Sequence, residues 1–214
     1  MEVVWNPMLN TTSFTLEALV VPEWDPSTLG LYYCLIESGG PVGGGKKTSG
    51  YAVYAGPEDP PNLNTPYRWQ VWVGSGTGFT QVKNTNPSMD PGLEVKFGKM
   101  TYIAITCDGT TLSLYSHFEG KDIDLIKGLE EPITFNPNLV KVKASFLIGI
   151  GRSLFPTVPV PPPAAPLLYP FKGKIQEVAF YNTALTAGNL KPHGEAACKN
   201  LQTQQRRNTH GVRK

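Results

Sequence analysis

Residues Lys99 to Tyr115 read KMTYIAITCDGTTLSLY, and this stretch decides the fold. Two runs rich in Ile, Thr, Tyr and Leu flank Asp108-Gly109. This pair supplies the positive φ angles of a type I′ turn, so the stretch is predicted to be a β-hairpin. Alternation places Ile105 on one face of the first strand and Tyr102 on the other. Because both faces are partly apolar, we expect the hairpin to be a central pair in a large sheet.

Other segments also alternate or are rich in β-branched and aromatic residues, as strands are. The 22 Gly and 20 Pro suit many strands joined by turns, and 40% hydrophobic residues supply a sizeable core. The sequence therefore predicts an all-β fold, an antiparallel jelly-roll β-sandwich with little helix. Lys121–Asn138 could hold one helical turn and Thr186–Leu190 another. A slip in alternation between Ile175 and Val178 indicates either a bulge or a strand covered on both faces. The further strands are expected at Ser13–Val21, Leu31–Ile36, Gly50–Ala55, Tyr67–Val73, Gly78–Val82, Val140–Ile150 and Lys174–Tyr181.

The hairpin and three further segments resemble, in the same order, laminin-G-like domains of the concanavalin A-like lectin/glucanase superfamily. Ser13–Pro22 (SFTLEALVVP) looks like the family's first core strand, and Phe146–Gly151 (FLIGIG) like the strand after the hairpin. Phe171–Leu190 (FKGKIQEVAFYNTALTAGNL) looks like its closing strand and short terminal helix. Two positions depart from the family pattern: Tyr102 stands where Trp is frequent, and Gln176 where Asp is frequent. The resemblance implies a concanavalin A-like sandwich and speaks to fold more than to function.

Catalysis by paired carboxylates is one activity that the resembled fold suggests. Many enzymes of that fold hold two or three carboxylates two residues apart on one strand, and glycoside hydrolysis needs two carboxyl groups about 5 Å apart or somewhat more. No such row exists here, because Glu17 stands alone on its strand and Glu177 is solitary. Glu119, Asp122 and Asp124 cluster only in a turn that contains Gly and Lys. The three histidines are scattered without metal-ligand spacing. The sequence therefore predicts a protein that binds and does not catalyse.

Aromatic residues in Tyr67–Val73 (YRWQVWV) suggest that a sugar binds by stacking, with nearby polar groups fixing its orientation. Alternation groups Tyr67 and Trp69 on one face and places Trp72 on the other, so Trp72 is the tryptophan expected at the surface. The alternative is that both tryptophans are core or cover residues. Lectin-like domains usually bind at the rim or on the concave face. The candidate ligand-binding residues are Trp24, Tyr54, Tyr67, Arg68, Gln70 and Trp72.

Relatives of the resembled fold often hold one calcium ion at the rim, bound by Asp side chains and backbone carbonyls. The sequence has no D-x-D-x-D loop, and Asp108 is accounted for by the predicted turn. Asp25, Asp59 and Asp90 are loop residues that could serve. Calcium therefore stays an alternative to a protein without a cofactor, and no ligand residue is assigned.

Charge is distributed unevenly along the chain. Residues 199–214 hold five of the 19 basic side chains and no acidic one, which leaves 14 basic against 17 acidic residues in 1–198. Such a body does not favour nucleic acid. We therefore expect one sandwich domain at 1–198 and a basic C-terminal arm at 199–214 that contacts an acidic groove on another protein subunit. The partner-binding residues of the arm are Arg206, Arg207, Arg213 and Lys214.

The opening residues MEVVWNPMLN lack the basic and apolar segments of a signal peptide, and no run approaches the ~20 apolar residues of a membrane helix. Three cysteines argue against a disulfide framework. The chain is therefore expected to be made in the cytoplasm, without membrane insertion, and to become part of a virion or other released particle. We interpret it as a structural, decoration or adhesion component of a virion (phage) or similar particle. The alternatives are a free-standing carbohydrate-binding lectin module and, less favoured, a glycoside hydrolase.

Truncation after Asn200 tests the role of the arm. Because the arm has few apolar residues for packing, the truncated protein should stay folded with a nearly unchanged melting temperature, while its association with a partner subunit weakens. Sedimentation of the full-length and truncated proteins, alone and with the presumed partner, measures this association. Identical sedimentation of the two proteins would indicate that the arm is a solvated chain end without a partner, and it would favour the interpretation as a lectin module.

Overall fold

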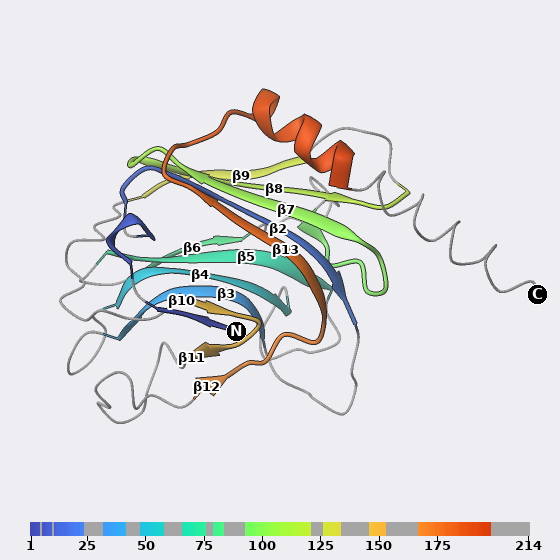
Figure 1. Ribbon diagram of the computed structural model, residues 1–214, viewed down its shortest axis with the longest axis horizontal. Helices are drawn as coiled ribbons and strands as arrows, with labels where there is room; N and C mark the ends of the chain where they lie inside the picture. Colours follow the sequence, from blue (N-terminus) through green and yellow to red (C-terminus); the bar gives the residue numbers. More distant parts are fainter. Residues whose placement is uncertain are drawn as a thin grey trace, which may run out of the picture.

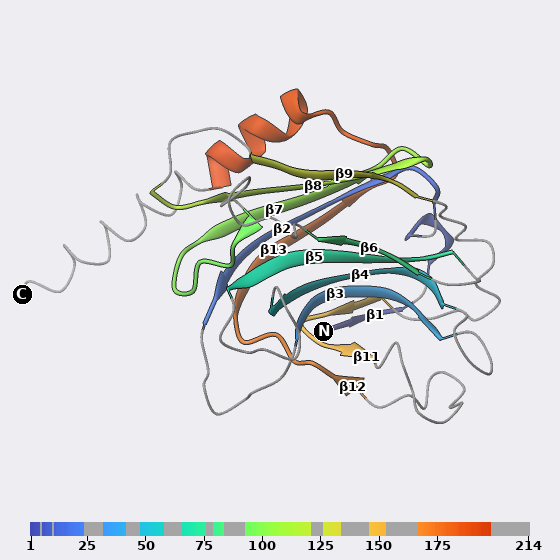
Figure 2. The same ribbon diagram turned by 180° about the vertical axis from the view of Figure 1, so that it is seen from behind.

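The computed structural model places two antiparallel β-sheets face to face, with one helix over the outer face of one sheet (Figure 1). Figure 2 gives the same layers from behind. The structure describes residues 1–4, 6–9, 11–23, 32–41, 48–57, 66–75, 79–83, 93–120, 126–133, 146–152 and 167–197.

Sheet A has six strands and sheet B has five. In spatial order, sheet A holds β1 (Glu2–Val3), β10 (Phe146–Ile148), β3 (Tyr33–Pro41), β4 (Thr48–Pro57), β5 (Tyr67–Ser75) and β6 (Phe79–Lys83). Sheet B holds β13 (Gly173–Tyr181), β2 (Phe14–Pro22), β7 (Thr101–Cys107), β8 (Thr111–Phe118) and β9 (Ile126–Pro132). The remaining elements are a 3₁₀ turn, η1 (Pro7–Leu9), and a two-stranded sheet of β11 (Gly151–Arg152) and β12 (Leu167–Leu168). The chain crosses repeatedly between sheets A and B, and the predicted all-β jelly-roll sandwich with little helix is confirmed.

The predicted hairpin forms β7 and β8, and β7 is the middle strand of sheet B. Every residue of β7 is buried. Ile103 and Ile105 face the core between the sheets, whereas Tyr102 and Ala104 belong to a second apolar cluster beneath the helix. The expectation of a central hairpin that is covered on both faces is therefore confirmed.

The turn of this hairpin is not of the predicted type I′. Among the described residues of the turn, positive φ is found at Gly109 (100°) and not at Asp108. Asp108 Oδ1 instead accepts hydrogen bonds from the backbone N–H groups of Thr110 and Thr111, each at 2.8 Å. The side chain thus closes the loop itself, so Asp108 does not need a left-handed backbone. These hydrogen bonds lower the pKa of Asp108.

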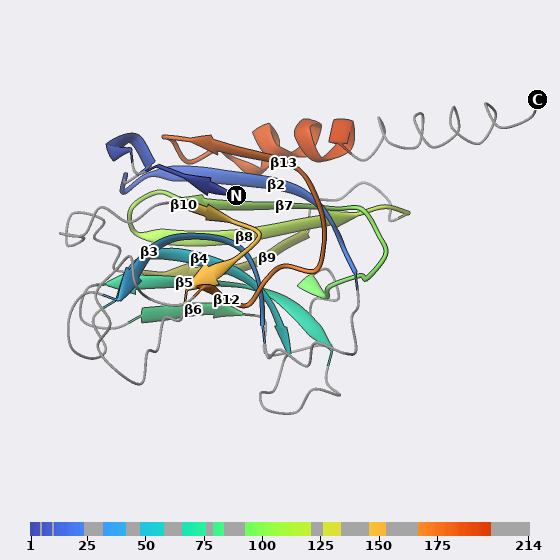
Figure 3. The same ribbon diagram turned by 60° about the horizontal axis from the view of Figure 1, so that its bottom comes forward.

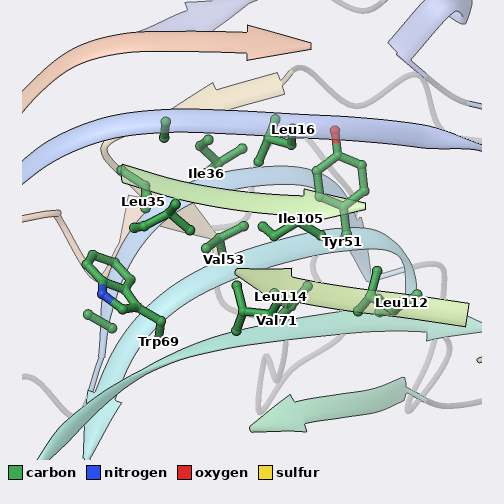
Figure 4. Packing of buried hydrophobic residues seen from close by; sticks show 14 of the residues in the cluster. Leu16, Leu35, Ile36, Tyr51, Val53, Trp69, Val71, Ile105, Leu112 and Leu114 are labelled. Carbon is green, nitrogen blue, oxygen red and sulfur yellow. The ribbon is translucent and has the colours of Figure 1, made fainter. Parts of the chain in front are cut away.

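The core fills the space between the two sheets with side chains from alternate positions of each strand (Figure 4). Leu16 and Ile105 come from sheet B, and Val53, Trp69 and Val71 from sheet A; each is at most 2% exposed. The alternation expected of strands is thus reproduced, since the strand period of two decides which side chains face the core between the sheets.

The helix of residues 187–197 lies over the outer face of sheet B (Figure 3). It begins after Thr186, whose Oγ1 accepts a hydrogen bond from the Asn189 N–H at 3.3 Å, while Asn189 Oδ1 accepts one from the Thr186 N–H at 3.2 Å. This reciprocal cap fixes the start of the helix. The single turn predicted at Thr186–Leu190 is too short, because the helix continues to residue 197. Gly194 lets the helix approach sheet B closely, since a Cβ atom at this position would lie 3.0 Å from the Tyr102 ring.

Two further expectations are resolved by the strand register. The bulge in the last strand is confirmed, since the β13–β2 register shifts between Ile175 and Glu177. The helical turn considered within Lys121–Asn138 is wrong for its described part, where β9 pairs with β8. Of the strand predicted at Val140–Ile150, the structure describes Phe146–Ile148 as β10.

The described cysteines, Cys34 and Cys107, are free and buried, as a small apolar residue would be. Cys198 lies outside the described residues. Within the described part of the chain, no helix has the length and apolar character needed to cross a bilayer.

Replacing Ile105 by Ala should destabilise the protein strongly. Ile105 is 1% exposed and pairs with Leu114 in the middle of sheet B, so the substitution removes buried apolar volume and leaves a cavity that costs about 2–5 kcal/mol. Thermal denaturation measures the effect. Val4→Ala, at a side chain that is 83% exposed, is the control and should melt like the parent. A parent-like melting temperature for Ile105→Ala would show that the hairpin is not central.

Candidate functional site

Four aromatic side chains gather on the face of sheet A that points away from the core. Tyr54 comes from β4 and Trp72 from β5, while Tyr32 precedes β3 and Tyr169 follows β12. Five ring pairs among them have centroids 5.7–6.2 Å apart at interplanar angles of 59–89°. Such edge-to-face contacts stabilise the group. These four residues are termed the outer aromatic cluster. Tyr32, Trp72 and Tyr169 are partly exposed, so the cluster reaches solvent.

The strands in the middle of sheet A are curved. In Figures 1 and 2, β3, β4 and β5 arch so that their concave side is turned away from sheet B. The segment after β12 pairs with the start of β3, where the Cys34 N–H donates a hydrogen bond to the Tyr169 carbonyl at 2.8 Å, and the Tyr169 ring contacts Tyr54 on the outer face. The aromatic cluster therefore lies on the concave face of sheet A.

Polar side chains beneath the cluster are buried and hold it in place. The Trp72 indole N–H donates to Gln70 Oε1 at 3.3 Å, and Gln70 Nε2 donates to the Pro57 carbonyl at 3.3 Å. Gln70 is 1% exposed and Arg68 is 2% exposed. Gln70 therefore fixes the orientation of the indole ring, and Arg68 lies two residues before it on the same strand face.

Two backbone features bring the tyrosines together. Gly56 lies against Tyr32, and a Cβ atom at this position would overlap the Tyr32 ring. Tyr169 has a φ of 57°, and no other described non-glycine residue has positive φ. A left-handed bulky residue is strained, and such strain persists only where surrounding contacts hold it. At Tyr169 those contacts are the rings of Tyr32 and Tyr54.

Burial raises the pKa of three ionisable groups in and beside the cluster. Burial raises the pKa of Tyr54, and the nearby Cys34 and Glu37 raise it further. Burial also raises the pKa of the Cys34 thiol and, together with Tyr169, that of Tyr32. Desolvation disfavours the charged form of each group. The surface therefore presents aromatic rings and neutral hydroxyl groups.

The structure separates the residues that were predicted to bind a ligand. Tyr54, Arg68, Gln70 and Trp72 share the outer face of sheet A. The prediction that Tyr67 binds a ligand is wrong. The residue is 4% exposed and packs in the core between the sheets, because it shares a strand face with Trp69. Trp24 lies outside the described residues, as does the basic arm with Arg206, Arg207, Arg213 and Lys214. Sequence reasoning missed Tyr32 and Tyr169; the only local signal was their position beside apolar runs.

A second group of polar residues, also missed, meets between the helix and sheet B. Glu17 of β2, considered solitary in the sequence, lies with Oε1 and Oε2 at 2.9 and 3.2 Å from Nδ1 of His193 on the helix. The Tyr181 ring stacks on His193 with centroids 6.3 Å apart. A cavity of about 290 Å³ opens here and also contacts Glu177 and Tyr102. Glu17, the only carboxylate on its strand, thus meets His193 of the helix, a contact that the sequence did not indicate.

No metal centre is found in the part of the chain that the structure describes. Within it, no three His, Cys, Asp or Glu side chains are placed to hold one ion. Asp108 is engaged in its turn. The loop aspartates considered for calcium, Asp25, Asp59 and Asp90, lie outside the described residues.

Comparison with known proteins finds likeness in structure but not in sequence. No family model matches the sequence, and no curated protein matches it. Domain 4 of AbnA, a GH43 extracellular arabinanase from Geobacillus stearothermophilus in complex with arabinotriose, aligns over 86% of this chain and 67% of its own. Its identity is 15% and its TM-score 0.44.

Two other solved structures align less completely in one chain or both. The exoplasmic/lumenal domain of VIP36 in its Ca²⁺/Man-bound form covers 57% of this chain and 55% of its own, with 15% identity and a TM-score of 0.37. The enzymatically active domain of bacteriophage CBA120 tailspike protein 2 covers 87% and 27%, with 8% identity and a TM-score of 0.45. The chain thus spans 27–67% of the length of these three proteins. Membership of the laminin-G-like domains stays a prediction.

Replacing Gly56 by Ala tests whether the cluster is as tightly packed as described. The added methyl group overlaps the Tyr32 ring, and overpacking of this kind lowers the free energy of unfolding by about 1–3 kcal/mol. The same substitution in a Tyr32→Ala background should cost clearly less, because the ring it displaces is gone. Urea denaturation of the four proteins measures the difference. An equal cost in both backgrounds would mean that Tyr32 does not lie over Gly56.

Proposed function

We propose that the protein binds a carbohydrate through the outer aromatic cluster and does not cleave it. The observation that carries this proposal is that Tyr32, Trp72 and Tyr169, from three separate segments, are partly exposed together on one concave face. Aromatic rings provide an apolar platform for the C–H face of a sugar, and neighbouring polar groups fix its orientation. The neutral hydroxyl groups of the tyrosines are such polar groups.

The arrangement of carboxylates supports binding without cleavage. Glu37, the carboxylate near Tyr54, is 0% exposed. Strand β11 packs against it, since a Cβ atom at Gly151 would lie 2.8 Å from Glu37 Oε2. A carboxyl group enclosed in this way has no path to a glycosidic oxygen. Glu17 and Glu177 line a cavity on the other sheet and are not neighbours of the cluster.

We also propose a setting for this surface, in which the protein is a structural or adhesion component of a virion or similar particle. The observation that favours it is the composition of residues 199–214, which carry five basic side chains and no acidic one. Such a segment suits an acidic surface on another subunit, where Arg forms bidentate bonds with carboxylates. In this setting, the concave face of the sandwich serves attachment to a glycan.

A glycan array followed by affinity measurements tests the carbohydrate proposal. For each glycan bound by the wild type, Trp72→Ala and Tyr169→Ala should weaken binding by roughly ten-fold, because each removes an aromatic contact surface. Phe118→Ala is the matched control, since Phe118 is a partly exposed aromatic residue at the end of β8 in the other sheet, and it should bind like the parent.

Two outcomes would contradict the proposal. The first is that no glycan on the array binds the protein above background, or that a bound glycan keeps its affinity in both Trp72→Ala and Tyr169→Ala. The second is the appearance of shortened glycans, detected by mass spectrometry after prolonged incubation with the protein, which would overturn the part that excludes cleavage.

A further inference from the structure

The cavity between the helix and sheet B, termed the helix–sheet cavity, lies on the opposite side of the sandwich from the outer aromatic cluster. It has a volume of about 290 Å³, near the lower end of the range of small-molecule sites. Its base is formed by β2 and β7, one side by the helix and the other by the edge strand β13. The cavity therefore suits a small ligand or a single side chain of a partner.

Two carboxylates contribute to this cavity at different depths. Glu17 is 7% exposed, whereas Glu177 is exposed and lies nearer the solvent. Glu17 pairs with Ala179 across the β2–β13 ladder and Glu177 pairs with Leu19, so the two carboxylates are diagonal neighbours on one face of the sheet. Burial, and then the nearby carboxylates of Glu17 and Glu177, raise the pKa of Tyr181, whose side chain lines the same cavity.

The charge of the cavity is negative. An ionised Glu17 can only accept hydrogen bonds, so the hydrogen bond with His193 requires that Nδ1 of the imidazole carries the proton. This holds for a neutral imidazole, which leaves two negative charges, and for an imidazolium, which leaves one. Among the described residues that line the cavity there is no Lys or Arg. The described lining thus supplies no basic side chain to balance the second carboxylate.

The remaining lining is aromatic and apolar. Tyr102 and Tyr181 contribute rings, and Leu19, Ala179 and Ala196 contribute aliphatic surface. Rings of this kind attract a positive charge through their π faces, and aliphatic side chains pack against a hydrocarbon stem. The same described lining does not provide three metal ligands around one point. The chemistry therefore favours an organic cation over a metal ion.

We propose that the helix–sheet cavity binds a primary ammonium group on a short apolar stem. The ammonium group donates hydrogen bonds to the carboxylates of Glu17 and Glu177, and the stem packs against the alanines of β13 and the helix. His193 acts as a positioning residue, because its hydrogen bond orients Glu17 toward the ligand. This inference does not depend on carbohydrate binding at sheet A.

The same head group occurs on a free amine and on a lysine side chain of a protein, and two probes separate these sources. Isothermal titration at low ionic strength uses n-butylammonium chloride and, separately, lysine with its α-amino and carboxyl groups blocked as amides. 1-Butanol is the neutral control of similar shape. We expect n-butylammonium to bind, with or without binding of the blocked lysine. 1-Butanol should bind at least ten-fold more weakly than n-butylammonium, because its hydroxyl group lacks the positive charge that strengthens hydrogen bonds to carboxylates. Binding of blocked lysine as tight as that of n-butylammonium assigns the site to a partner's lysine, and n-butylammonium alone assigns it to a free amine.

Substitutions that remove charge but keep shape connect the binding to the cavity. Glu177→Gln should weaken n-butylammonium about ten-fold, and Glu17→Gln should do the same while keeping an acceptor for His193. Glu23→Gln is the matched control, because it removes a negative charge just after the end of β2, beside Lys174 at 3.8 Å and outside the cavity. This variant should bind like the parent. If Glu17→Gln fails to fold, the exposed Glu177 still gives the answer. Absence of binding of both cationic probes, equal binding of 1-butanol, or unchanged affinity in Glu177→Gln would overturn the proposal.

Discussion

Both faces of β7 are buried, and this two-sided packing sets the position of the other layers. On one face, Ile103 and Ile105 pack against sheet A across the core. On the other, Tyr102 and Ala104 need a cover, which the helix of residues 187–197 supplies through Leu190. The closeness of that cover requires Gly194, since a larger residue would meet the Tyr102 ring. A helix that follows the last strand in sequence is thus tied to the first strands of sheet B, and the reciprocal cap of Thr186 and Asn189 fixes where it starts.

The two outer faces of the sandwich are completed in different ways, and each leaves a different surface. Sheet B is covered by a helix that carries small residues opposite β13, so a cavity remains between them, with Glu17 and His193 bonded across it. Sheet A is covered only in part by described elements, where β11 and the segment with Tyr169 pack on β3. Aromatic rings beyond that cover stay partly exposed. Both candidate sites therefore arise where a sheet face is incompletely covered, one charged and one aromatic.

The sequence predicts well what depends on local alternation and poorly what depends on distant contacts. The faces of β2 and β5 follow from a period of two, so the outward positions of Gln70 and Trp72 could be predicted. The same rule placed Tyr67 beside Trp69, and its burial in the core follows from that pairing. Strand β9 was missed because its sequence holds Lys127, Glu130 and Glu131, a composition typical of loops as well as of edge strands.

The parts of both sites that could not be predicted come from residues far apart in the chain. Tyr169 reaches Tyr32 only because the chain returns from β12 to β3, and Glu17 and His193 are separated by 176 positions. No local pattern encodes such meetings. The turn type of the hairpin was predicted wrongly for another reason. Asp108 closes the turn with its side chain, whereas the rule for Asp-Gly turns considers only the backbone.

The bulge in β13 affects how copies of the protein can meet. β13 is an outer strand of sheet B, and an outer strand with regular spacing offers unpaired N–H and C=O groups to any neighbouring chain. The shift between Ile175 and Glu177 breaks that regular spacing and twists the strand, which makes it a poor template for continuous pairing. The opposite margin, β9, ends at Pro132, which has no N–H to donate, and β1 at the margin of sheet A is only two residues long. These three margins are therefore poor templates for edge-to-edge pairing with another chain.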